Sequence, residues 1–249
     1  MKAFFRLILL VLLAGLSLQL YFVGRIAMMA VVNPESTAFQ RSAVYSVVTT
    51  TGSLKWRQQW LAYSDISDNL KRAVIASEDA SFIEHEGLDI EALEKAWDKN
   101  ATAEKRVQQL GVKNLNAKTP AKPVKPAKIV GGSTITQQLA KNLFLSGERT
   151  LLRKGQELVL TLLLERLLSK ERILELYLNS VEWGEGVFGA DAASQHYYRK
   201  SAAKLSAFEA ARLAVMLPRP KYFEARPNSG YLSSRASTIA ARMGDVEIP

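Results

Sequence analysis

The longest uncharged apolar run is the feature that most constrains this chain. Residues 7–24 read LILLVLLAGLSLQLYFVG, and no charged side chain occurs between Arg6 and Arg25. About 20 apolar residues in a helix cross the hydrocarbon core of a bilayer. Lys2 and Arg6 precede the run, and basic residues before a span favour a cytoplasmic N-terminus. We therefore expect a cytoplasmic tip and transmembrane anchor over residues 1–32, with the rest of the chain outside the cytoplasm.

A cleaved signal peptide is the main alternative for this segment. The apolar character continues past Arg25 as IAMMAVV, and no small-residue cleavage site follows the run closely, so an uncleaved anchor is favoured. A buried core helix is a weaker alternative, because a soluble domain would then begin at its N-terminus with an uninterrupted apolar segment.

The overall composition fits a folded domain with acidic partners. The chain has 249 residues, 48% of them hydrophobic, and a formal net charge of +9. The apolar content is enough for a core, and the positive charge favours nucleic acid, anionic lipid or phosphorylated substrates without choosing between them. No cysteine is present, which excludes disulfides and thiolate metal sites.

The remainder of the chain predicts a mainly α fold. We assign residues 33–64 to a membrane-proximal segment, with YSVVTT at 45–50 as a short strand, and residues 65–249 to the folded domain. Apolar periodicity predicts helices over residues 66–77, 88–97 and 150–169, with Ser67 and Asp89 as caps of the first two. A further helix is predicted from Ser169 onwards, and a capping box at Ser206 opens another that ends near Pro218. Strand and helix patterns do not alternate, so a parallel sheet is not expected.

Residues 98–130 change in character. They are rich in lysine, and prolines interrupt their second half. This composition predicts a basic, flexible or polyproline-like insertion, either a solvated loop or a segment attracted to anionic headgroups.

The segment GGSTITQQLAKN at residues 131–142 combines small, hydroxyl, amide and ammonium groups. Ser133 or Thr134 can cap the helix that follows, and Thr134 and Gln137 have capping-box spacing. Gln137 and Lys141 share one helix face. A helix N-terminus with these groups suits a phosphate or diphosphate, although an ordinary capped helix fits the pattern equally well.

Two pairs of charged residues are candidates for chemistry. Glu78 and Asp79 end the helix predicted at 66–77, and burial there would raise a carboxyl pKa, as a general acid or base requires. Arg153 and Glu157 lie one turn apart on an otherwise apolar helix, which places them toward solvent, a partner or a cleft. The alternative for both pairs is a solvated surface.

Taken together, these blocks resemble the family 51 glycosyltransferases, the peptidoglycan glycosyltransferases. The resemblance covers about Ile66 to Tyr222 and rests on EDASFIEHEG, GGSTITQQLAKN, RKGQE, KERILELYLN and EWGEGVFGADAASQHYY, in that order. The chain leaves no room for a second large domain, so the resemblance is to the monofunctional members.

The resemblance implies a lysozyme-like, mainly α domain that polymerises lipid II into β-1,4 glycan strands. The donor would be a glycan on undecaprenyl diphosphate, transferred with inversion to the GlcNAc 4-hydroxyl of lipid II. Glu78 would be the general base and Glu157 the second catalytic carboxylate, aiding departure of the diphosphate. The substrate-binding residues would be Asp79, Phe82, His85, Ser133, Thr134, Gln137, Gln138, Lys141 and Arg153.

The resemblance also implies a setting. No cofactor is obligatory, although a divalent Mg or Mn ion at the diphosphate would be compatible. The partners would be lipid II, the lipid-linked glycan, membrane lipids and other cell-wall synthesis or division proteins, with no nucleic acid. The chain would be a single-pass protein of the bacterial inner membrane, with its catalytic domain on the periplasmic side.

Two departures from the family pattern stand out. The connection at 98–130 is longer than usual, which affects acceptor binding or membrane contact. Tyr198-Arg199-Lys200 replaces the commoner Phe-Gly-Lys, a change that we interpret as minor.

Other functions fit the residues less well. A lysozyme-like hydrolase or lytic transglycosylase would use a similar glutamate without a diphosphate cradle, and a tethered basic binding protein would act through residues 99–128. Ser201-x-x-Lys204 and Ser67-Asp68-Asn69 match transpeptidase motifs in the wrong order and without K-T-G. A zinc protease would need a second histidine four residues after His85, and none is there.

Overall fold

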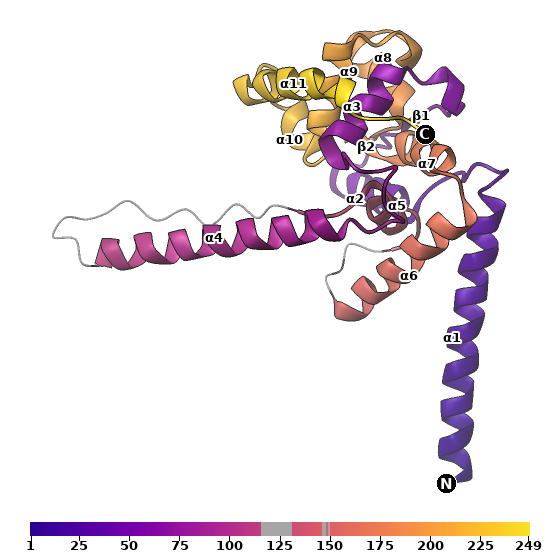
Figure 1. The fold of residues 1–249 in the computed structure, drawn as a ribbon. Helices are drawn as coiled ribbons and strands as arrows, with labels where there is room; N and C mark the ends of the chain where they lie inside the picture. Colours follow the sequence, from indigo (N-terminus) through magenta and orange to yellow (C-terminus); the bar gives the residue numbers. More distant parts are fainter. Residues whose placement is uncertain (116–130, 146–147, 149) are drawn as a thin grey trace. The chain divides into compact units, whose positions relative to one another are not determined.

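The computed structural model describes residues 1–115, 131–145, 148 and 150–249. The chain forms two compact units, of which one comprises Met1–Gly87 with Ile135–Pro249 and the other comprises Leu88–Thr134. Helices make up most of both units (Figure 1).

Helix α1 (Lys2–Met28) contains the apolar run. It is long and apolar enough to cross a membrane, with a mean hydropathy of 2.3 over its most apolar window, and that window is not buried. Only its last turns join the core: Phe22 meets the Phe144 ring edge-on at 5.3 Å, and Ile26 is fully buried. Gln19 exchanges amide hydrogen bonds with Gln156. The C-terminal end of α1 therefore belongs to the same packed unit as the helices that follow.

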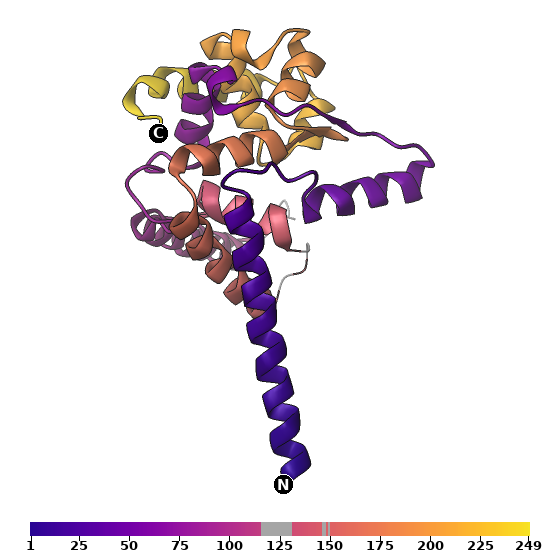
Figure 2. The same cartoon turned by 90° about the vertical axis from the view of Figure 1, so that its right-hand side faces the viewer.

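Helix α2 (Ala38–Thr51) replaces the strand expected at 45–50, so that expectation is wrong. The β-branched run misled the prediction, because the ends of the segment decide its structure. Thr37 and Gln40 form a capping box at 3.0 and 2.8 Å, and Gly52 ends the helix in the left-handed region. Gln40 Nε2 also donates to the Ser180 carbonyl at 3.1 Å, which ties α2 to the end of a later helix. Figure 2 shows α2 following the loop that leaves α1.

The core of the larger unit is helical, which confirms the expected mainly α fold. The bounds of the remaining helices in this unit are α3 Asp68–Glu78, α5 Ile135–Phe144, α6 Leu151–Leu167, α7 Lys170–Ser180, α8 Ala190–Tyr198, α9 Ala207–Met216, α10 Pro220–Glu224 and α11 Gly230–Arg242. Helices α3, α9 and α11 pack together, and α5 packs against α2, α6 and α7. Short 3₁₀ turns occur at Tyr63–Asp65, Ala202–Lys204 and Met243–Asp245.

A small mixed sheet joins the membrane-proximal segment to the glycine-rich block. Its strands β1 (Arg57–Gln58), β3 (Val187–Phe188) and β2 (Glu182–Gly184) lie in that order. β1 pairs with β3 in parallel and β2 pairs with β3 antiparallel, so the one parallel pair of this sheet is only two residues long.

The predicted helix starts at Ser67, Ser169 and Ser206 are confirmed, and Thr150 caps the helix expected at 150–169. Ser67, Thr150, Ser169 and Ser206 accept hydrogen bonds from the first turns of α3, α6, α7 and α9. Ser201 caps a 3₁₀ turn in the same way, so both apparent transpeptidase serines serve helix starts. Helix α8 ends at Arg199, whose φ of 56° is in the left-handed region.

The smaller unit contains α4 (Ile90–Leu115), which begins with the Asp89 carboxylate accepting from Ala92 N at 2.7 Å. The helix continues to Leu115, so a flexible insertion from residue 98 is wrong for its first half, and residues 116–130 lie outside the described residues. Gly132 lies close to this helix, because a Cβ there would sit 3.2 Å from the Leu93 Cα. Its lack of a side chain therefore serves packing.

Candidate active site

The Glu78 carboxylate lies at the last residue of α3, where an apolar helix ends. Gln138 Nε2 donates to its Oε2 at 3.1 Å, and the Ser77 hydroxyl is 3.5 Å from its Oε1. Burial raises the pKa of Glu78 above its ordinary value, and these two hydrogen bonds oppose the rise. The direction of this shift is the one that a general acid or base requires.

Gln138 is held from its other side by Tyr177. The Tyr177 hydroxyl donates to Gln138 Oε1 at 2.9 Å, so the amide presents its NH₂ group to Glu78. Tyr177 is fully buried on α7, and burial followed by the charges of Glu78 and Asp79 raises its pKa well above the ordinary value. It therefore stays a neutral donor. Sequence reasoning treated Tyr177 only as a core residue, because its apolar spacing gave no sign of a partner 39 positions away.

Asp79 is buried, and the contacts described for it are structural. Its Oδ1 is 2.8 Å from His85 Nε2, and its Oδ2 accepts from the Ile135 amide at 2.9 Å. The carboxylate therefore joins the end of α3 to the start of α5, as a cap supplied from another helix. Because the Ile135 N–H is engaged, the tip of α5 cannot offer that donor to a ligand.

His85 and Phe82 complete the same support. Gly87 N donates to His85 Nδ1 at 3.1 Å, so the ring nitrogen facing Asp79 carries the proton. Phe82 is fully buried, and Lys170 lies 4.5 Å above its ring while donating to the His85 carbonyl at 2.6 Å. These two predicted binding residues fix the segment after Glu78.

The other residues of the GGSTITQQLAKN block lie on or before α5. Gln137 is buried in α5, and Ser133 and Thr134 belong to the smaller unit, where Thr134 is also buried. Gln138 and Lys141 follow on α5, and Lys141 is exposed.

A cluster of three cations surrounds one buried carboxylate where α5 meets α6. Arg153 Nη1 donates to Glu157 Oε2 at 2.8 Å, and Lys154 pairs with Oε1. Burial alone would raise the pKa of Glu157, but these hydrogen bonds and charges outweigh it and lower the pKa. Partial desolvation lowers the pKa of Lys141, and the charges of Arg153 and Lys154 lower it further against the attraction of Glu157. The cluster carries two more positive than negative charges. We refer to Lys141, Arg153, Lys154 and Glu157 as the cation cluster.

Helix α6, which carries most of the cation cluster, also exposes an apolar surface. Helices α5 and α6 pack together, and α6 also packs on α1. Large apolar side chains of α6 are exposed: Leu151, Leu152, Leu158, Val159 and Leu162. An apolar cavity of about 480 Å³ runs along the same helix, lined by Val159, Leu162, Leu163 and neighbouring charged residues. Positive charge and apolar surface thus meet on α6, an arrangement suited to an amphiphile.

Comparison with known proteins supports an assignment to a family. A model described as "Transglycosylase" matches residues 46–111 and 116–244. A "Biosynthetic peptidoglycan transglycosylase" of Burkholderia thailandensis is 51% identical over 236 residues, covering 95% of this chain and 84% of the relative. A relative of the same description from Herminiimonas arsenicoxydans is 49% identical, over 100% of this chain and 98% of the relative. Another from Paraburkholderia phytofirmans is 48% identical, over 95% of this chain and 90% of the relative.

Proposed function

Because this chain belongs to the transglycosylase family, we propose that Glu78, Gln138 and the cation cluster form the machinery with which it polymerises peptidoglycan. The chain is a peptidoglycan glycosyltransferase that builds glycan strands, and its mainly α domain is of the lysozyme-like kind expected. Its substrates are therefore lipid-linked sugars, and the site must supply a base for the acceptor and positive charge for the leaving group.

Glu78 acts as the general base. It takes the proton of the GlcNAc 4-hydroxyl of lipid II, while that oxygen attacks C1 of the donor sugar. The new C1–O bond forms as the bond from C1 to the diphosphate breaks, and the diphosphate leaves with the electron pair. Attack opposite an α-linked leaving group yields a β-1,4 linkage, so the configuration inverts. The observation that carries this assignment is the position of the Glu78 carboxylate at the end of α3, where Gln138 donates to one oxygen and burial raises the pKa.

Gln138 keeps one carboxylate oxygen of Glu78 oriented. Its amide nitrogen donates to Oε2, and Oε1 accepts no bond shorter than the 3.5 Å contact from Ser77 among the described residues. Oε1 is therefore the oxygen that accepts the substrate proton. The Tyr177 hydroxyl prevents the amide from turning over.

The cation cluster receives the leaving diphosphate. Three cations close to one another are unfavourable without an anion, and Glu157 supplies only one negative charge. Lys141, Arg153 and Lys154 can therefore bind phosphate oxygens through charge-assisted hydrogen bonds as negative charge develops on them. The exposed leucines of α6 would lie beside the polyprenyl chain of the same lipid.

Glu157 positions the cations rather than protonating the leaving group. Its lowered pKa keeps it ionised near neutral pH, and its two oxygens are engaged by Arg153 and Lys154. A divalent Mg or Mn ion fits this donor set poorly, because the only carboxylate of the cluster is already neutralised. The mechanism therefore needs no metal, and activity that persists after chelation of divalent ions would support this part.

The location follows from α1. We propose that α1 anchors the chain in the bacterial inner membrane, with Lys2 and Arg6 in the cytoplasm and the catalytic domain in the periplasm. Both lipid-linked substrates would then reach the domain from the bilayer to which it is anchored. Other cell-wall synthesis proteins would meet it on that side.

The direct test is polymerisation of purified lipid II by the full chain and by Glu78→Gln. We expect the variant to lose about 10²–10⁴-fold in rate, the usual contribution of a general base. Glu84→Gln is the matched control, because Glu84 is exposed and lies in the same short segment. A Glu78→Gln chain that polymerises at nearly the wild-type rate would refute the assignment.

A further inference from the structure

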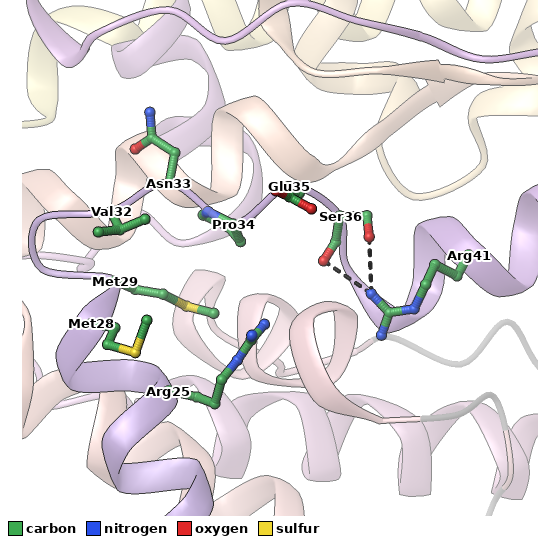
Figure 3. Close-up of a pocket in the computed structure, with 9 residues that line it drawn as sticks. All are labelled: Arg25, Met28, Met29, Val32, Asn33, Pro34, Glu35, Ser36 and Arg41. Atoms are coloured by element: carbon green, nitrogen blue, oxygen red, sulfur yellow. Dashed lines mark hydrogen bonds between the residues drawn. The ribbon is translucent and has the colours of Figure 1, made fainter.

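A second cavity lies away from Glu78, at the C-terminal end of α1. It has a volume of about 400 Å³ and is enclosed by the last turn of α1, the loop after it and the first turn of α2. Figure 3 shows the residues that line it. The predicted active site uses none of them.

Two arginines from different helices face this cavity. Arg25 projects into it from α1, and the guanidinium of Arg41 reaches its rim from α2 (Figure 3). Arg41 is held in place by hydrogen bonds to the carbonyl and hydroxyl oxygens of Ser36, at 3.1 and 3.0 Å. Within the described residues, neither arginine forms an ion pair with a carboxylate, although Glu35 also lines the cavity. The cavity therefore has a net positive charge.

The position of the cavity along α1 corresponds to the headgroup region of a bilayer. The uncharged run before Arg25 covers residues 7–24, which rise about 27 Å as a helix, close to the thickness of the hydrocarbon core. Arg25 is thus placed at headgroup level. Met28 and Val32 line the same cavity with more than half of their surface exposed, at 56% and 53%. Apolar and cationic surfaces therefore lie side by side where acyl chains give way to headgroups.

The wall of the cavity is fixed to the catalytic domain. Arg172 of α7 donates from Nε to the Met29 carbonyl at 2.6 Å. Its Nη2 donates to Asn33 Oδ1 at 2.7 Å and to the Val32 carbonyl at 3.2 Å. One guanidinium thus holds three points of the loop. The loop that lines the cavity is therefore held in a defined conformation by these hydrogen bonds.

We propose that this cavity binds the headgroup of an anionic glycerophospholipid, with Arg25 and Arg41 clamping its phosphate. Guanidinium groups match phosphate oxygens in pairs, and Met28 and Val32 would contact the adjoining glycerol and upper acyl carbons. The proposal rests on α1 spanning the membrane, and it is independent of the role given to Glu78. It makes the junction of anchor and domain a lipid site in its own right.

The test measures lipid binding directly. The full chain in detergent is mixed with dioleoyl phosphatidylglycerol, dioleoyl phosphatidylcholine or undecaprenyl diphosphate, and bound lipid is counted by native mass spectrometry. We expect Arg25→Gln/Arg41→Gln to bind phosphatidylglycerol roughly 20-fold more weakly, with roughly 5-fold for each single change. Phosphatidylcholine binding should not change. Arg242→Gln/Lys204→Gln, which removes the same charge from exposed positions elsewhere, should behave as the wild type.

Each alternative result has a meaning. Arg25→Lys/Arg41→Lys retains the charge but not the paired guanidinium donors, so it should weaken phosphatidylglycerol binding less than the Gln pair does, and it also guards against misfolding in the Gln variants. Equal losses in the Lys and Gln pairs would overturn the proposal, and so would unchanged phosphatidylglycerol binding in the Gln pair. If only undecaprenyl diphosphate binding fell, the cavity would belong to the substrate lipid and the proposal would be wrong.

Discussion

The side-chain amide of Gln138 donates to the carboxylate of Glu78 across 3.1 Å, and this contact joins α5 to the end of α3. It favours the ionised carboxylate, whereas burial favours the neutral one. The pH at which Glu78 could act as the proposed base therefore depends on whether the Gln138 amide keeps its orientation.

Tyr177→Phe should shift the pH dependence of polymerisation. Without the hydroxyl, the Gln138 amide is no longer fixed, and the loss of its bond raises the pKa of Glu78 further. Because the deprotonated form is the base, the acidic limb of kcat/KM should move to higher pH, while the rate on the plateau changes less. The measurement is a pH profile with lipid II. Tyr198→Phe serves as the control, and an unchanged acidic limb in Tyr177→Phe would contradict the relay.

Asp79→Asn should lower stability more than it changes the chemistry. The carboxylate caps α5 at Ile135 and bonds His85 while buried, so its loss should cost about 1–3 kcal/mol in the free energy of unfolding. Thermal unfolding of the full chain in detergent measures this. Glu84→Gln removes an exposed carboxylate from the same segment and should cost less than about 1 kcal/mol. Equal melting temperatures for Asp79→Asn and the wild type would exclude the capping role.

Lys141→Gln should reduce kcat/KM roughly 10- to 100-fold, the value of one charge-assisted hydrogen bond to phosphate. The lowered pKa of Lys141 adds a second expectation, because its charge is lost at lower pH than that of a free lysine. The alkaline limb of the wild-type profile should disappear or move in the variant. Lys204→Gln is a control of equal charge. A variant with normal kcat/KM and normal inhibition by pyrophosphate would remove Lys141 from the diphosphate site.

Arg199→Gly should stabilise the fold by about 1 kcal/mol. Arg199 ends α8 with a φ of 56°, a conformation that costs a residue with a Cβ about 1–2 kcal/mol and glycine almost nothing. The family pattern has glycine here, so the departure noted in the sequence has a measurable cost. Ser237→Gly, at an exposed position in the middle of α11, should instead destabilise by about 0.5 kcal/mol. Thermal unfolding should show a higher melting temperature for Arg199→Gly and a lower one for Ser237→Gly than for the wild type.

Local signals were sufficient for most of the helices. Ser67, Thr150, Ser169 and Ser206 each precede an apolar periodic segment, and the structure begins a helix after each of them. The strand prediction for residues 45–50 was wrong because it gave the valines and threonines more weight than the capping residues at the ends of the segment. The capping-box spacing from Thr37 to Gln40 was visible in the sequence.

The site was harder to predict than the fold, because its contacts are long-range. The resemblance assigned the base to Glu78, but nothing in the sequence showed that Asp79 caps α5 or that Gln138 donates to Glu78. Their partners lie 60 and 56 positions along the chain. Lys154 was missed even though it lies only one turn from Glu157, because a lysine beside Arg153 is indistinguishable in sequence from an ordinary solvated charge.

Arg172 has a mechanical consequence. A single side chain holds the turn after α1 and so links α7 to the C-terminal end of α1. If α1 anchors the chain in a bilayer, as proposed, this link would hold Glu78 at a fixed distance from the lipid, and a force exerted on the domain by a growing strand would be transmitted to the bilayer.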